Sequence, residues 1–325
     1  MTLPEFHQMH LFQFLVKHLH VRLASTSIPG IALDDFRHDC PLNCPSSSSS
    51  QPCTCSIDLV VRCQGQKVTE FPRFPPEVDR VVFAELNMAG ANIQKLHPDD
   101  FLALRVRRLV LTGNRLSKSL SNYVFSSLGI HLTSLMLGAC AIRALPPRLL
   151  VDLAQLKVLH LWGNQIENIP DDFFISNAAL HELSLWGNRL QTIQNRTFHS
   201  LHRLRVLDLD GNRINVLERQ VLGHVSGTLQ VLRLSGNHIS ALSDSTFSDL
   251  RQLRILALAS NRVRFIDART FVGLRQLQSH HHHHLTLFIF FFLGTREYFC
   301  TSRGTINYHQ ETHWTDLLET STHGL

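Results

Sequence analysis

The residues with the most obvious chemistry in this chain are its cysteines. Five of the seven lie within one short segment: Cys40, Cys44, Cys53, Cys55 and Cys63. Such a dense cluster indicates a framework of disulfides and therefore an oxidising compartment. A zinc site is the alternative, but a single residue separates Cys53 from Cys55, whereas paired zinc ligands normally have two or more between them. We therefore expect disulfides in this segment and no bound metal.

Two tryptophans form the second group of interest, because Trp162 and Trp186 occur 24 residues apart in the same context, Leu-Trp-Gly-Asn. Exposed tryptophan is unfavourable unless a partner covers it, and tryptophan is enriched among the residues that dominate binding energy at interfaces. We expect the two rings to stack on an open surface and to bind a partner. The alternative is that the indoles pack only on each other and on their neighbours.

Catalytic motifs are missing from the sequence. It contains no G-x-S-x-G motif, no HExxH motif, no phosphate-binding P-loop and no Rossmann fingerprint. His160 and Asp208 could be drawn as a dyad, but they lie two repeats apart and no column of nucleophiles lies beside them. We therefore expect a protein that is not an enzyme and that uses no cofactor.

A repeat of about 24 residues positions these side chains. The frame Leu-x-x-Leu-x-Leu-x-x-Asn-x-Ile runs from Leu156 to Ile166 and returns from Leu180 to Leu190. Its ninth position falls, at steps of 23 to 26 residues, on Ala91, Asn114, Cys140, Asn164, Asn188, Asn212, Asn237 and Asn261. This pattern predicts an α/β fold, the leucine-rich repeat solenoid: a curved horseshoe with a parallel β-sheet on its concave face and an irregular or short helical convex side.

Each part of the frame has a structural role. The Leu-x-Leu core predicts a short strand whose leucines face the interior. The asparagine side chains can satisfy backbone groups that no strand reaches, so they should form a structural ladder. Cys140 is expected to be a free, buried and structural thiol, and Ala91 marks the first repeat as degenerate. Phenylalanines at repeat spacing should fill the convex side: Phe101, Phe125, Phe173 or Phe174, Phe198, Phe247 and Phe271.

The residues between and beside the strand leucines should form outward columns, one residue per repeat and about 4.8 Å apart. The middle column reads Asn87, Val110, Met136, His160, Ser184, Asp208, Arg233 and Ala257. The two tryptophans and Asp210 lie in the column that follows it, and Glu182 lies in the column before it. The predicted partner-binding residues are therefore Trp162, Trp186, His160, Glu182, Asp208, Asp210 and Arg233.

The repeat frame also divides the chain. Residues 1–39 are expected to be an atypical, disordered leader, because they fit a cleavable signal peptide poorly. Residues 40–77 are the predicted cysteine-rich cap, and residues 78–278 hold about eight repeats and the start of a ninth. The run His280 to His284 interrupts that ninth frame, and an aromatic run follows it. We expect residues 279–325 to be a disordered tail outside the native fold; a metal-binding histidine tract is the less favoured alternative.

Composition bears on the remaining partner classes. The formal net charge of +5 and the pI near 9.0 are mildly basic, but no block of Lys and Arg is present. We therefore expect no nucleic-acid partner. No segment approaches the ~20 apolar residues of a membrane helix, so no membrane insertion is expected. Asn195 begins the only N-x-S/T sequon, where a glycan is expected if the protein is secreted.

Residues 44–278 resemble secreted or cell-surface leucine-rich repeat proteins with a cysteine-rich N-terminal cap. Within that group, Cys44-Pro45 and the later Pro52 to Cys55 are similar to arthropod proteins named after the non-catalytic subunit of oplophorus-luciferin 2-monooxygenase. The Leu-Gly-x-x-Leu spacing from Leu128 to Leu132 is chaoptin-like. The resemblance implies two disulfides, Cys44–Cys55 and Cys53–Cys63. The use of Cys40 in place of Cys44 is left open.

From the repeat and the resemblance we expect an extracellular protein that binds or scaffolds a protein partner on its concave face. Secretion, or display on the outer side of the cell surface, is implied although a signal peptide is not evident. Two alternatives remain. One is a non-catalytic, stabilising subunit of a luciferin-monooxygenase-like complex, and the other is the ectodomain of an adhesion or receptor protein.

Overall fold

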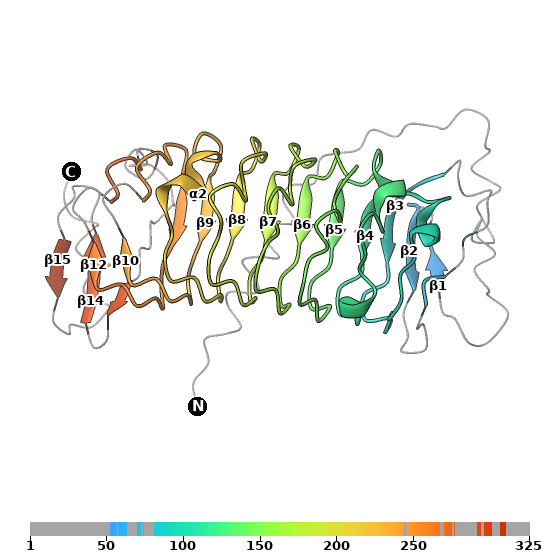
Figure 1. Ribbon diagram of the computed structural model, residues 1–325, viewed down its shortest axis with the longest axis horizontal. Helices are drawn as coiled ribbons and strands as arrows, with labels where there is room; N and C mark the ends of the chain where they lie inside the picture. The colour runs from blue at the N-terminus through green and yellow to red at the C-terminus, as the bar shows by residue number, and fades with distance from the viewer. Residues whose placement is uncertain are drawn as a thin grey trace. The chain divides into compact units, whose positions relative to one another are not determined.

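The computed structural model describes residues 53–56, 58–63, 70–72, 74, 81–242, 246–266, 270–274, 276, 291–293, 296–300 and 306–309. Its main feature is a ten-stranded sheet (Figure 1). In spatial order the strands are β1 (Cys53–Cys55), β2 (Val60–Cys63), β3 (Val82–Asn87), β4 (Arg105–Val110), β5 (Ser134–Met136), β6 (Val158–His160), β7 (Glu182–Ser184), β8 (Val206–Asp208), β9 (Val231–Arg233) and β11 (Ile255–Ala257). Only β1 is antiparallel to its neighbour, so the predicted parallel sheet with one strand per repeat is present.

The register of this sheet aligns the same frame position in every repeat. Leu135 is opposite Leu159, and Leu159 is opposite Leu183. The strand leucines from β5 to β11 are at most 1% exposed, because they point into the core. The residues on either side of each leucine point to the other face of the sheet, which we call the open face. The middle column predicted from the sequence is confirmed from Asn87 to Ala257.

The asparagine at the ninth frame position holds consecutive repeats together. In Asn164, Oδ1 accepts a hydrogen bond from the Ile142 N–H at 3.0 Å, one repeat back. Its Nδ2 donates to the carbonyls of Leu137 and Leu161 at 2.9 and 2.8 Å. Equivalent bonds, one accepted from the previous repeat and two donated to carbonyls, are made by Asn114, Asn188, Asn212, Asn237 and Asn261. These buried backbone groups would otherwise lack partners.

Cys140 occupies the same position. Its side chain takes over the hydrogen bonds that the asparagine would donate, and its backbone takes over the one that the asparagine would accept. Its Sγ lies 3.0 Å from the Leu111 carbonyl and 3.3 Å from the Gly138 carbonyl, so the thiol takes the donor role of the amide. The acceptor role passes to the backbone, because the Leu116 N–H donates to the Cys140 carbonyl at 3.1 Å. Burial raises the pKa of the Cys140 thiol to about 11, which keeps it protonated. The predicted free and buried thiol is confirmed.

The outer side of the repeats is mostly irregular. Its helices are short: η3 (Pro98–Phe101), η4 (Leu116–Lys118) and η5 (Ser126–Leu128) are 3-10 helices, and α2 (Arg219–Gly223) is a single helical turn. The phenylalanines pack in separate runs, with ring centroids 5.4 Å apart for Phe101–Phe125 and 6.3 Å for Phe174–Phe198. In the intervening repeats leucine and valine fill the equivalent space: Leu149, Leu150, Val221 and Leu222. The predicted aromatic spine is therefore interrupted where α2 and the Leu149 turn replace it.

The N-terminal end of the sheet is covered by a β-hairpin. Strand β2 continues the parallel sheet beside β3, and β1 turns back against β2 with Cys53 opposite Cys63. A disulfide joins these two cysteines, and Cys63 is fully buried. The hairpin covers the first repeat of an array that would otherwise end in an open core. Cys40 and Cys44 lie outside the described residues, as does the predicted leader.

Strand β11 is the last described strand of the ten-stranded sheet, although Phe271 still stacks on Phe247 one repeat earlier and Leu274 is buried. Strands β10 (Ala241–Leu242) and β12 (Phe265–Ile266) pair in parallel as a separate two-stranded sheet. Strands β13 (Phe291–Leu293), β14 (Arg296–Cys300) and β15 (Ile306–His309) form an antiparallel sheet of their own. The run of histidines lies outside the described residues. The assignment of residues 279–325 to a tail outside the native fold stays a prediction.

Candidate functional site

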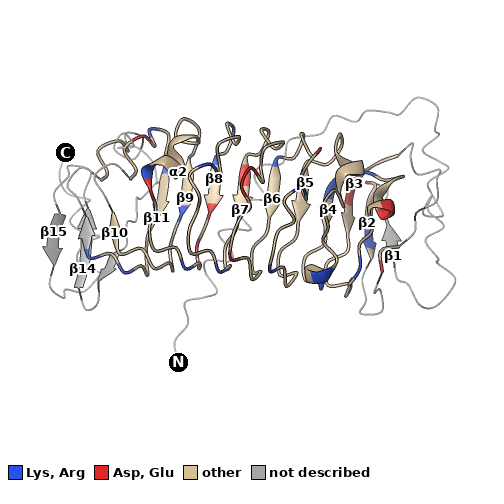
Figure 2. Cartoon of the chain, in the orientation of Figure 1, with Lys and Arg blue, Asp and Glu red and all other residues tan. Residues whose placement is uncertain are grey.

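The open face brings together the predicted partner-binding residues from β6 to β9. His160, Ser184, Asp208 and Arg233 are consecutive partners in the register, so they form one row across four strands. Glu182 lies two residues before Ser184 on β7. The tryptophans and Asp210 lie two residues after the row, where each strand turns into the asparagine position. Figure 2 shows acidic positions on β7 and β8 and a basic position on β9.

The two tryptophans are in contact, but they do not stack as expected. Their ring centroids are 6.0 Å apart, and the ring planes are inclined at 45°. Trp186 is 48% exposed, whereas Trp162 is half-buried. The difference arises because the Trp162 indole lies on the backbone of Gly138 in the preceding repeat. A Cβ added to Gly138 would come within 2.4 Å of the ring atom Cε2. Trp162 thus supports Trp186, which faces solvent.

His160 and Glu182 form a hydrogen-bonded pair beside the tryptophans. His160 Nε2 lies 2.8 Å from Glu182 Oε1. The His160 ring is mostly buried and the Glu182 carboxylate is about one-third exposed. The hydrogen bond from His160 holds the pKa of Glu182 below its ordinary value. The Glu182 carboxylate is therefore ionised at neutral pH. Its hydrogen bond holds the His160 imidazole in place at the end of β6, two residues before Trp162.

Asp208, the last residue of β8, and Asp210, two residues after it, bring two carboxylates close together on the open face. The Asp210 N–H donates to Asp208 Oδ1 at 3.1 Å, and the Ser235 N–H donates to Asp210 Oδ1 at 2.5 Å. Burial, and then the charge of Asp208, raises the pKa of Asp210 to about 7. Burial also raises the pKa of Asp208, while the guanidinium of Arg233 lowers the pKa of both. The charge of this acidic cluster consequently changes close to neutral pH.

Two residues that matter for this surface were not assigned a role from the sequence. Gly138 provides the space for Trp162, and its position in the tryptophan column was the only signal. Ser184, in the middle of the row, is only 7% exposed, so the larger side chains on either side cover it. Ser184 is therefore not available to a partner, although the column places it between His160 and Asp208.

The described residues give little support for catalysis. None of them form a group of three or more His, Cys, Asp or Glu side chains suited to a metal ion. On the outer side, Ser200 Oγ lies 3.1 Å from His199 Nε2, but His199 Nδ1 is bonded to the Arg196 carbonyl. Asp172 approaches the same Nε2 at 3.7 Å, so it does not orient the ring as the third member of a triad.

Asn195 lies on the turn before Phe198, away from the open face. Its side chain is exposed, so a glycan there would leave the row and the tryptophans uncovered. Within the described part of the chain, no helix is long and apolar enough to cross a membrane.

Comparison with protein families supports the repeat. The leucine rich repeat family model matches three segments, residues 154–214, 178–226 and 227–279. These segments contain β6 to β11, including all seven predicted partner-binding residues. None of the curated protein sequences compared with the chain matches it.

The chain is also similar to parts of several solved structures. A leucine-rich repeat protein of Leptospira interrogans has 26% identity and a TM-score of 0.53, over 63% of this chain and 50% of that one. The TLR13–ssRNA13 complex has 25% identity and a TM-score of 0.44, over 62% of this chain and 25% of the receptor. The Toll–Spätzle complex of Drosophila has 20% identity and a TM-score of 0.39, over 62% and 33%. The chain therefore spans at most half the length of these structures.

Proposed function

We propose that this leucine-rich repeat solenoid is a binding module and that it recognises a protein partner on its open face. The observation that carries the proposal is the tryptophan pair: Trp186 is half exposed and rests on Trp162, which is itself fixed on Gly138. A rigid, exposed indole beside partly buried charges is typical of the residues that dominate protein interfaces. The leucine-rich repeat fold favours this role over catalysis, because successive strands present a broad and regular surface.

The charges around the tryptophan pair indicate which chemistry the partner would present. Glu182 is held ionised by His160, and Asp208 and Asp210 both lie in the repeat that follows that of Trp186. A partner lysine or arginine over the Trp186 ring would gain a cation–π contact and an acidic neighbour together. We therefore expect the partner to contribute a basic side chain at this point.

The Cys53–Cys63 disulfide supports an extracellular setting for this binding. Structural disulfides persist in secreted and cell-surface proteins and are rare where thiols are kept reduced. An extracellular role, whether secreted or displayed on a cell, is therefore part of the proposal.

The test is affinity purification with the full chain as bait, comparing the wild type with the double variant Trp162→Ser and Trp186→Ser by quantitative mass spectrometry. A partner that the wild type enriches should be lost on the order of tenfold or more from the double variant, because truncated interface tryptophans remove much of the binding energy. The circular dichroism spectrum should be unchanged. Gly138→Ala should weaken capture as well, since the added methyl displaces the Trp162 indole.

Matched controls separate this effect from a general loss of apolar surface. Ile130 and Ile175 are exposed at 77% and 53% on other parts of the repeats, so the variant Ile130→Ser and Ile175→Ser should keep the partner. Gly227→Ala, which meets open space, is the control for Gly138→Ala. If the folded tryptophan variant captures every partner as well as the wild type, the proposed site is wrong.

A further inference from the structure

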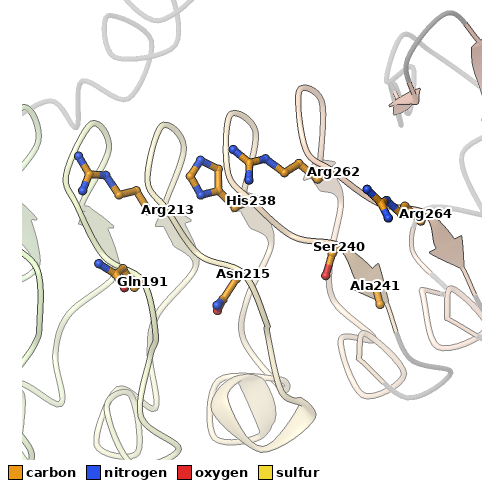
Figure 3. Close-up of a pocket in the computed structure, with 8 residues that line it drawn as sticks. All are labelled: Gln191, Arg213, Asn215, His238, Ser240, Ala241, Arg262 and Arg264. Carbon is orange, nitrogen blue, oxygen red and sulfur yellow. The ribbon is translucent and has the colours of Figure 1, made fainter.

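A second surface lies along the turns that follow the strands of the last repeats. There a hollow of about 730 Å³ is lined by four basic side chains, Arg213, His238, Arg262 and Arg264. Figure 3 shows the first three projecting from successive repeats, with Arg264 next to them. Blue segments also recur along this lower edge of the last repeats in Figure 2. We call this surface the basic groove.

The repeat itself sets the spacing of the basic groove. Arg213, His238 and Arg262 each come directly after a ladder asparagine, at the tenth position of the frame. Their N–H groups donate to the carbonyls of Leu190, Ile214 and Ile239 in the preceding repeats, each at 2.9 Å. The backbone at this edge is therefore fixed, and the side chains leave it at the inter-strand distance of about 4.8 Å. A linear array of three positive or protonatable groups results.

Within the described part of the chain, these basic side chains form no ion pair with an acidic neighbour. The ion pairs of the described residues involve other side chains, and none of them includes Arg213, His238, Arg262 or Arg264. The three arginines are exposed and His238 is half-buried. Gln191, Asn215 and Ser240 complete the lining with amide and hydroxyl groups. The described lining of the groove thus combines positive charge with neutral hydrogen-bonding groups.

We propose that the basic groove binds a sulfated polysaccharide. Arginine forks bind the oxygens of tetrahedral anions, and the repeat spacing suits a chain that carries such anions at intervals. The amide and hydroxyl side chains match the hydroxyl groups between the sulfates. The disulfide-bonded cap favours an extracellular polyanion, because sulfated polysaccharides occur outside the cell.

The lining argues against a nucleic acid as the occupant. Proteins that hold single-stranded nucleic acids stack the bases on aromatic side chains. Among the described residues that line the basic groove there is no Phe, Tyr or Trp. The Trp162–Trp186 pair lies instead on the open face, at the seventh position of the frame. Arg213 and Arg262 are at the tenth position.

The test measures binding of heparin to the full chain by calorimetry at physiological salt. The variant Arg213→Gln, Arg262→Gln and Arg264→Gln should bind heparin on the order of tenfold or more weakly, and the salt dependence of binding should become shallower. A control with the same change in net charge, Arg203→Gln, Arg251→Gln and Arg254→Gln, alters exposed arginines outside the groove and should bind like the wild type.

Further measurements compare heparin with other polyanions and separate the basic groove from the open-face site. Unsulfated hyaluronan and single-stranded poly(U) should both bind more weakly than heparin. The Trp162→Ser and Trp186→Ser variant should keep heparin binding, so the groove can hold even if the proposed open-face site fails. Equal loss in the groove and control variants would overturn the proposal. So would binding of hyaluronan or poly(U) as tight as that of heparin.

Discussion

Asp210 is the residue on the open face whose charge is least favoured by its surroundings. It is partly buried next to Asp208, and its pKa is raised to about 7. The Ser235 N–H stabilises the carboxylate but does not offset the desolvation and the neighbouring charge. Glu182 is the opposite case, because a direct hydrogen bond from His160 lowers its pKa. Two carboxylates in adjacent repeats therefore respond differently to pH.

The variant Asp210→Asn tests this difference. Because the folded-state pKa is raised, the wild type loses stability as the pH rises from the unfolded pKa of 3.8 towards about 7, and the loss is complete above that. Asn keeps the acceptor for Ser235 without the charge. We expect it to stabilise the fold above neutral pH by on the order of 1 kcal/mol, since solvent screens part of the effect.

Urea denaturation across the pH range measures that gain. The advantage of Asp210→Asn should shrink as the pH is lowered from about 7, and it should be lost below 3.8, where the carboxyl becomes protonated in the folded and unfolded chains alike. An advantage that stayed constant with pH, or a destabilised variant at alkaline pH, would contradict the raised pKa. Asp249→Asn is a suitable comparison, because an exposed bond to Arg219 lowers that pKa.

At the scale of elements, the β1–β2 hairpin decides how the array ends. In a repeat array each unit is stabilised mainly by its neighbours, so an end unit is held from one side only. The hairpin supplies the missing side for β3, and the Cys53–Cys63 disulfide ties the hairpin together. Since the bridge closes a loop with a sequence separation of 10, its expected contribution is about 2–4 kcal/mol.

The variant Cys53→Ala and Cys63→Ala should therefore loosen the end of the sheet before its middle. Amide hydrogen exchange should show lost protection in β2 and β3, with β7 and β8 little changed, because the effect decays along the array. Reduction of the wild type should reproduce the pattern. Uniform loss of protection in all repeats would show instead that the sheet unfolds as one cooperative unit.

At the scale of the whole molecule, the repeats and the C-terminal strands form separate sheets. Strands β13 to β15 pair only with one another among the described residues, whereas β2 to β9 and β11 form the continuous parallel sheet. The ninth frame breaks at the histidine run, where the inward positions should be leucines. Both observations favour a repeat array that does not depend on residues 279–325.

A chain ending at Gln278 tests that independence. Its free energy of unfolding should stay within about 0.5 kcal/mol of the full chain, the range typical of changes outside the packed core. A chain ending at Asp244 is the control: it removes β11 and should be clearly destabilised, because it exposes the buried leucines of β9. A large loss of stability in the first truncation would place the tail within the native fold.

The sequence by itself determined the solenoid, because the frame repeats the same physical requirement in each unit. Leucines at the two-residue period must face the core, and an asparagine must satisfy the turn that follows. The register from Asn87 to Ala257, the ladder from Asn114 to Asn261 and the buried thiol of Cys140 could all be predicted on these grounds. Each depends on contacts between equivalent positions of adjacent repeats.

Only the tertiary structure decided how the side chains on the surface interact. The tilt of Trp186 on Trp162 depends on the space above Gly138, and the pKa of Asp210 depends on burial between two strands. The basic groove was missed because its residues are about 24 positions apart in the sequence and form no Lys or Arg block. Such features depend on the shape of the packed surface and on its local dielectric constant, and neither can be predicted from the period of the repeat.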